Sequence, residues 1–262
     1  MNAVARIGDY TLGKWGELRT LGAVLWAIST TAARPGFWKR TVRAEIARQI
    51  YSAGVEASRF VAYVAFALGV SVVAQALAWM HKFGQTRSLG PLLVAVLVRA
   101  AVPVLTNLLA IARNGTALTT ELGTMQASGE VRVLDAQGLD PFVYLVVPRV
   151  LGLTIAVFCL NVIFLFVAFA SGYVFSTLLS PDIEDAAAFV RSVLVSVGPL
   201  DLVNFLAISL FPALFTGAIC CIEGLAVGSS VTEVPAAARR ALARSVRALF
   251  LTTALISFLT YV

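Results

Sequence analysis

Two polar side chains inside a long apolar segment are the residues of this sequence best placed to do chemistry. Arg99 interrupts the apolar stretch 92–112, and Asn107 follows two helical turns later on roughly the same face. Ionisable residues within such segments are energetically costly and are therefore candidates for function. A guanidinium binds phosphate through two parallel hydrogen bonds, so Arg99 is a candidate for contact with a lipid headgroup. Structural pairing with a neighbouring helix is the alternative.

Three further charged residues lie at the ends of apolar segments. Glu56 and Arg59 stand one helical step apart at the start of the first apolar segment and could form an ion pair. Glu223 follows the fourth apolar segment. For all three, pairing between helices is the favoured interpretation.

The sequence gives no positive sign of a catalytic, metal or nucleotide site. Its single histidine, His81, is expected at a membrane interface. Its three cysteines, Cys159, Cys220 and Cys221, fall in apolar runs without zinc-ligand spacing. The chain has no G-x-x-x-x-G-K-[ST] phosphate loop. We therefore expect no cofactor on this chain, and energy from nucleotide would have to come from a partner.

Membrane-spanning helices must position these residues. Of the 262 residues, 59% are hydrophobic and 13% are charged, whereas a typical soluble domain has roughly 25% charged residues. A helix needs about 20 apolar residues to cross the hydrocarbon core of a bilayer. The sequence therefore predicts an all-α integral membrane protein with five spans, at residues 60–80, 92–112, 150–181, 202–222 and 241–262.

The distribution of lysine and arginine predicts the orientation. Sixteen of these residues lie in the N-terminal region and in the segments expected on its side of the membrane, against three in the other two connections. Basic residues concentrate on the cytoplasmic side. The N-terminus is therefore predicted to be cytoplasmic and the C-terminus to lie outside. The same arrangement accounts for the net charge of +6 without a nucleic-acid partner.

Residues 1–50 are predicted to precede the transmembrane domain (51–262) as amphipathic helices in the membrane interface. Leu21 and Leu25 belong to an apolar helical face, and the Ala-Arg-Pro-Gly stretch 33–36 breaks the first helix. Basic residues of the second helix suit anionic headgroups. A simple membrane anchor is the favoured interpretation, and an elbow that transmits motion is the alternative.

The connection between the second and third spans is the most informative segment. Residues 114–141 carry Leu118, Leu122 and Met125 at helical spacing. An exposed apolar ridge on a cytoplasmic helix needs a cover. A groove on a partner protein would provide one, and so would the helix bundle of the chain itself. The pattern alone leaves both possibilities open.

This connection also carries a family resemblance. Its motifs are Glu121-Leu-Gly-Thr-Met125, Gly138-Leu-Asp-Pro141 and Tyr144-Leu-Val-Val-Pro-Arg149. They closely resemble the signature of the MlaE/YrbE permease family, the membrane subunits of ABC transporters that work with MCE-domain proteins. The resemblance covers roughly residues 37–262. The chain departs from the family pattern at Arg99-Ala-Ala-Val-Pro103, where Arg-Glu-Leu-Gly-Pro is usual, and at Gly129 and Arg132, where acidic or amide residues are usual.

The resemblance implies a permease that acts as a dimer, most simply a homodimer, in the bacterial inner membrane. Its implied partners are a cytoplasmic ABC ATPase that binds ATP and Mg²⁺, a periplasmic MCE-domain protein and, optionally, a small STAS-type subunit. Phospholipid or a similar lipid would occupy a cavity between the two permease subunits. We assign Arg99, Asn107, Glu56 and Arg59 to this cavity. We assign contact with the ATPase to Glu121, Leu122, Gly123, Thr124, Met125, Leu134, Asp140 and Pro141.

Two alternatives come from other functional classes. An ion-coupled secondary carrier would use Arg99 and Glu56 and would follow an ion gradient without nucleotide. A non-transporting membrane scaffold or enzyme would have no ATPase partner. Copurification of a P-loop ATPase, and its release when Glu121 or Met125 is changed to Lys, would favour the permease. Transport along an ion gradient without nucleotide would favour the carrier.

Overall fold

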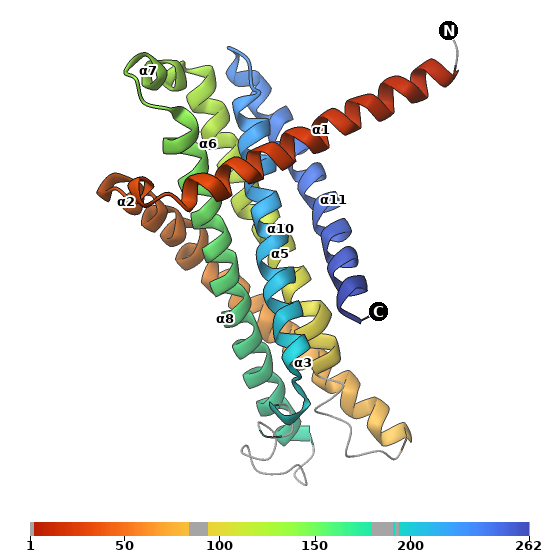
Figure 1. Cartoon of the computed structure of the whole chain (residues 1–262). Helices are drawn as coiled ribbons and strands as arrows, with labels where there is room; N and C mark the ends of the chain where they lie inside the picture. The colour runs from red at the N-terminus through yellow and green to blue at the C-terminus, as the bar shows by residue number, and fades with distance from the viewer. Residues whose placement is uncertain (1–2, 84–93, 180–190, 192–193, 262) are drawn as a thin grey trace.

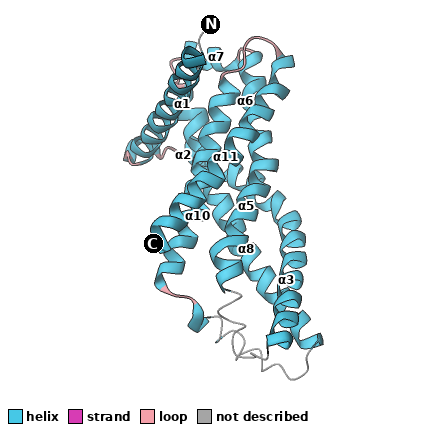
Figure 2. Cartoon of the chain, turned by 90° about the vertical axis from the view of Figure 1, so that its right-hand side faces the viewer, coloured by secondary structure: helices cyan, strands magenta, loops and turns pink. Residues whose placement is uncertain are grey.

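The computed structural model describes residues 3–83, 94–179, 191 and 194–261, and these are almost entirely helical, with no strand among them. Figures 1 and 2 show a bundle of long helices, crossed by one helix at the N-terminal end of the chain. The connections after the first and third predicted spans fall largely outside the described residues.

The N-terminal third of the chain contains a separate helix and then one long helical rod. Helix α1 (Ala3–Ala32) ends just before the predicted break, which contains the short helix η1 (Pro35–Phe37). Helix α2 (Arg40–Ile50) then passes without interruption through the π-helical segment η2 (Tyr51–Val55) into α3 (Glu56–Phe83). The second predicted interfacial helix is therefore the start of the first spanning rod.

A second rod runs from the second span into the connection that follows it. It consists of η4 (Val94–Ala101), α5 (Val102–Ala110), η5 (Ile111–Gly115) and α6 (Thr116–Ala127). Most of the predicted polar connection is thus helical, and its first half continues the span directly. Helix α7 (Glu130–Ala136) folds back at the tip.

The last three spans complete the bundle. The segment η6 (Phe142–Val146) leads into α8 (Val147–Leu179). Helix α10 (Pro199–Leu225) runs back towards the α6–α7 end, where η7 (Val231–Glu233) connects it to α11 (Val234–Tyr261). Five helical segments of the described chain are long and apolar enough to cross a membrane, which confirms the predicted number of spans: Arg40–Ala76, Val94–Ala127, Phe142–Thr177, Pro199–Leu225 and Val231–Thr260.

Small residues allow the central helices to approach closely. A Cβ atom added at Gly69 of α3 would collide with Ala168 of α8, and one added at Gly217 of α10 would lie only 3.1 Å from the side chain of Val150, also on α8. Such contacts stabilise helix pairs in a membrane, where apolar burial alone gives little preference for protein over lipid. Helix α8 consequently forms the centre of the bundle, in contact with α2, α3 and α10.

Candidate functional site

Helices α6 and α7 form a hairpin at one end of the bundle (Figure 1). The turn between them contains Gly129, whose backbone has a φ of +83°. This left-handed conformation is costly for residues with a Cβ atom. The glycine that departs from the family pattern is therefore required by the turn as this chain makes it.

The inner face of α6 is covered by its own chain. Leu118 and Leu122 are fully buried, and a Cβ atom added at Gly224 of α10 would lie 2.9 Å from Leu122 Cβ. A Cβ atom added at Gly123 would lie 3.2 Å from Val227 and 3.4 Å from Val234, the first residue of α11. Of the two covers that the sequence left open for Leu118 and Leu122, the structure shows the chain's own bundle, because α10 and α11 pack against this face. Contact of Leu122 and Gly123 with an ATPase stays a prediction.

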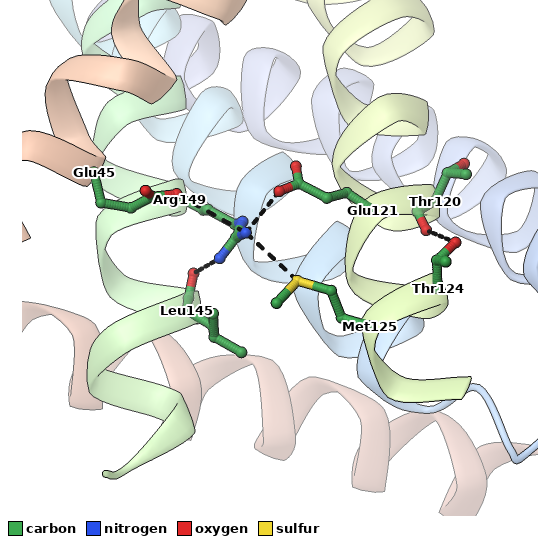
Figure 3. Close-up of polar contacts among 7 residues, drawn as sticks. All are labelled: Glu45, Thr120, Glu121, Thr124, Met125, Leu145 and Arg149. Carbon is green, nitrogen blue, oxygen red and sulfur yellow. Dashed lines mark hydrogen bonds and ion pairs between the residues drawn. The ribbon is translucent and has the colours of Figure 1, made fainter. Parts of the chain in front are cut away.

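Arg149 lies at the centre of the polar contacts at this end of the bundle (Figure 3). It belongs to α8, and only 4% of its side chain is exposed. Its Nη2 atom lies 2.7 Å from Glu121 Oε1 on α6 and 3.9 Å from Glu45 Oε1 on α2. Its Nη1 atom donates a hydrogen bond of 3.2 Å to the carbonyl of Leu145. One guanidinium thus connects three helical elements.

Sequence reasoning missed this role of Arg149. It counted the residue among the basic residues of a cytoplasmic loop, whereas the structure buries it in the first turn of α8. Its position beside a 32-residue uncharged segment is a signal that could have been used. The partner could not have been found in this way, because Glu121 lies 28 residues earlier on another helix.

The remaining residues assigned to ATPase contact differ in exposure. Thr124 is exposed, and its hydroxyl donates to the carbonyl of Thr120 (Figure 3). Met125 is half-buried, with its sulfur 3.7 Å from Arg149 Nη2. Leu134 of α7 is also half-buried and packs against the core.

Asp140 and Pro141 precede the third span, where Asp140 acts as a helix cap. The exposed carboxylate of Asp140 accepts a hydrogen bond of 2.9 Å from the backbone N–H of Phe142. Helix starts leave backbone N–H groups without partners, and side chains of this kind satisfy them. This contact gives Asp140 a structural role, and its assignment to ATPase contact stays a prediction.

Arg99 forms an ion pair that the sequence did not reveal. Its Nε lies 2.8 Å from Oδ1 of the buried Asp201, and its Nη2 donates to Oδ2. The same carboxylate accepts the backbone N–H of Gly198 at the start of α10. Arg99 itself is partly exposed. Structural pairing, the stated alternative for Arg99, is therefore observed, and contact with a lipid stays a prediction.

The other residues assigned to the lipid cavity differ in burial and in partners. Asn107 is buried and donates to the carbonyl of Pro103 and to that of Ile208 on α10, so it joins two helices of the chain. Glu56 and Arg59 are exposed, and the ion pairs among the described residues do not include them. The favoured pairing of Glu56 and Arg59 is therefore not observed, and their assignment to a lipid cavity stays a prediction.

Glu223 is the buried centre of a second charged cluster. Its carboxylate is 7% exposed and pairs with Arg240, at 3.1 Å, and with Arg244, both on α11. The favoured interpretation of Glu223 as a structural pairing residue is thus confirmed. No group of three or more potential metal ligands occurs among the described residues.

The fold and these contacts define an all-helical, multi-pass membrane protein with a polar hairpin at one end. The sequence model of a family described as "Permease MlaE" matches residues 46–259. The chain therefore belongs to the MlaE permease family, which provides the membrane subunits of ABC transporters and leaves ATP hydrolysis to a separate subunit.

Individual relatives agree with this assignment. A probable ABC transporter permease protein of Rickettsia prowazekii is 26% identical over 76% of each chain. One of Synechocystis is 31% identical over 68% of this chain and 67% of its own length. The intermembrane phospholipid transport system permease protein MlaE of Haemophilus influenzae is 28% identical over 48% of this chain and 49% of its own.

Proposed function

We propose that the chain is the permease through which an ATP-driven transporter moves phospholipid, or a similar lipid, between the bacterial inner membrane and an MCE-domain partner. The observation that carries this proposal is the match of the family over residues 46–259. It is supported by the similarity to a permease whose name specifies intermembrane phospholipid transport. Neither the secondary-carrier nor the scaffold alternative has comparable support.

The α6–α7 hairpin is the proposed contact for the ATPase. It contains the specific motif block, its inner face is fixed to α10 and α11, and its outer face carries the exposed Thr124. At the tip, Val133 of α7 exposes 56% of its surface among charged and polar neighbours. An exposed apolar side chain on a polar tip suits insertion into a groove of a partner.

The proposed assembly contains two copies of the permease with lipid between them. Large apolar side chains on the outside of α3, including Tyr63 and Phe66, are available to a second copy or to lipid. Glu56 and Arg59 are exposed on the same rod. With the N-terminus in the cytoplasm and the C-terminus in the periplasm, the hairpin would face the ATPase, with any STAS-type subunit bound there too. The opposite end would face the MCE-domain protein.

The proposal is tested by purifying the tagged permease from its own membranes and asking whether a P-loop ATPase and phospholipid copurify. We expect both, with the lipid identified by mass spectrometry. Val133→Asp should reduce recovery of the ATPase, because a carboxylate replaces the apolar contact at the tip. The matched control is Val195→Asp, since Val195 is also strongly exposed but lies at the opposite end of the bundle.

Three results would overturn the proposal or one of its parts. Absence of an ATPase from the purified wild-type protein would contradict its place in an ABC transporter. Equal recovery of the ATPase with Val133→Asp and Val195→Asp would remove the hairpin tip as the docking site. Labelling of an introduced cysteine at Thr124 from the periplasmic side would reverse the proposed orientation.

A further inference from the structure

The guanidinium of Arg149 lies at unequal distances from its two carboxylate partners, which a contact that only holds the helices together does not require. Its Nη2 atom is hydrogen-bonded to Glu121 and only reaches the outer limit of an ion pair with Glu45. Its Nε atom is buried without a hydrogen-bond partner in the described structure. A guanidinium has five N–H donors, and this one is incompletely satisfied where burial makes that costly.

Glu45 is a suitable second partner for this guanidinium. Its side chain is 28% exposed, and it makes no hydrogen bond to the described residues. Its carboxylate needs to move by only about 1 Å to reach normal hydrogen-bond distance from Arg149. The two carboxylates also come from different helical elements, as Figure 3 shows.

We infer that Arg149 is a positioning residue that exchanges its carboxylate partner, from Glu121 on α6 to Glu45 on α2, when the hairpin moves. A buried guanidinium that loses one carboxylate needs another nearby, because an unpaired buried charge is strongly unfavourable. Helix α6 continues the second span and α2 continues into the first. The exchange therefore links a movement of the hairpin to the rod that forms the first span.

A link of this kind has a direct consequence for the transport cycle. The exchange itself is a property of this chain, and its role in coupling rests on the proposed function. In that role, Glu45 pairs with Arg149 in the state that follows movement of the hairpin. Loss of Glu45 would leave the observed state, in which Arg149 pairs with Glu121, intact and would destabilise the moved state. ATP turnover would therefore fall while the ATPase stayed bound.

The first test of the exchange is a double-mutant cycle on the thermal unfolding of the full-length permease as purified from its membranes, together with any partners that copurify. Glu45→Gln should lower the unfolding midpoint slightly. Glu121→Gln should lower it only moderately, because Glu45 can then pair with Arg149. The combined variant should lose far more than the two losses added together, since no carboxylate remains for Arg149. Additive losses, or no effect of Glu45→Gln in either background, would overturn the exchange.

The second test measures ATP turnover by the complex in vesicles of phosphatidylethanolamine and phosphatidylglycerol. Glu45→Gln should lower turnover about tenfold while the ATPase still copurifies, within the range by which single residues modulate coupling. Glu45→Asp should restore part of it, because it retains the charge. Ser52→Ala, which changes an exposed side chain on the same rod, should behave as wild type.

The outcomes separate this inference from the proposed function. Wild-type turnover by Glu45→Gln, or equal losses with Glu45→Gln and Glu45→Asp, would overturn the coupling role. If no ATPase copurified with the wild-type chain, both the proposed function and the coupling role would be overturned. The stability cycle would still decide the exchange, because it needs no nucleotide.

Discussion

Two charged clusters at the hairpin end of the bundle differ in the sign of the buried charge and in the number of elements that supply its partners. In one, the buried cation Arg149 lies between two carboxylates from different elements, Glu121 and Glu45, at unequal distances of 2.7 and 3.9 Å. In the other, the buried anion Glu223 is held by two arginines of a single helix, Arg240 and Arg244.

This difference separates a movable contact from a fixed one. Arg240 and Arg244 are four residues apart and therefore lie on one face of α11, so both contact the same neighbouring helix, α10. Any shift of α11 moves both arginines together, and nothing is gained by exchanging them. The carboxylate partners of Arg149 belong to two different elements, the first and second spanning rods, so a shift of one rod does not by itself move the other carboxylate. Helix α6 lies between the two clusters, in contact with α8 through Glu121 and with α10 through Leu122.

The largest effect should come from removing both arginines that hold Glu223. The double variant Arg240→Gln/Arg244→Gln leaves a buried carboxylate without a cation, which typically costs about 3–5 kcal/mol. We expect a large fall in the unfolding midpoint of the purified permease or failure to accumulate in membranes. Adding Glu223→Gln to the double variant removes the stranded charge and should restore much of the stability. No restoration would mean that the cluster does not brace α10 and α11.

A smaller effect is expected where α6 packs beside this fixed cluster. In Gly224→Ala, the new Cβ would lie 2.9 Å from Leu122 Cβ and 3.0 Å from the carbonyl of Thr119. The hairpin helix must shift, at a cost of about 1–3 kcal/mol for overpacking. Thermal unfolding measures the loss. Gly22→Ala is the control, because nothing lies within 4 Å of its added Cβ, and it should be neutral or slightly stabilising. Equal behaviour of the two variants would contradict the close contact of α6 with α10.

The smallest effects should come from exchanging arginine for lysine, which tests the geometry of each cluster rather than its charge. Arg149→Lys retains the charge but cannot direct a planar fork at two carboxylates, and we expect a loss of about 1–2 kcal/mol. Arg240 is 55% exposed, so Arg240→Lys should cost less than about 0.5 kcal/mol. Unfolding midpoints compare the two variants directly. A reversed order would show that Arg149 acts as a simple point charge.

Much of this architecture follows from the sequence because the bilayer imposes local rules. An uncharged segment of sufficient length has to cross as a helix, whatever its neighbours are. The five spans were therefore predictable from composition along the chain, and the helix break near Pro35 was predictable from local backbone chemistry. The motif block from Glu121 to Pro141 was likewise sufficient to indicate the family.

The tertiary structure alone decided which residues meet. Arg99 and Asp201 are 102 residues apart in sequence, and Arg149 and Glu121 are 28 apart. Such pairs depend on how each helix is rotated about its axis and on its register against its neighbours, which hydrophobicity along one segment does not specify. For the same reason, the sequence could not tell what covers Leu118 and Leu122. An apolar helix face has the same sequence pattern whether a partner protein or the chain's own α10 and α11 pack against it.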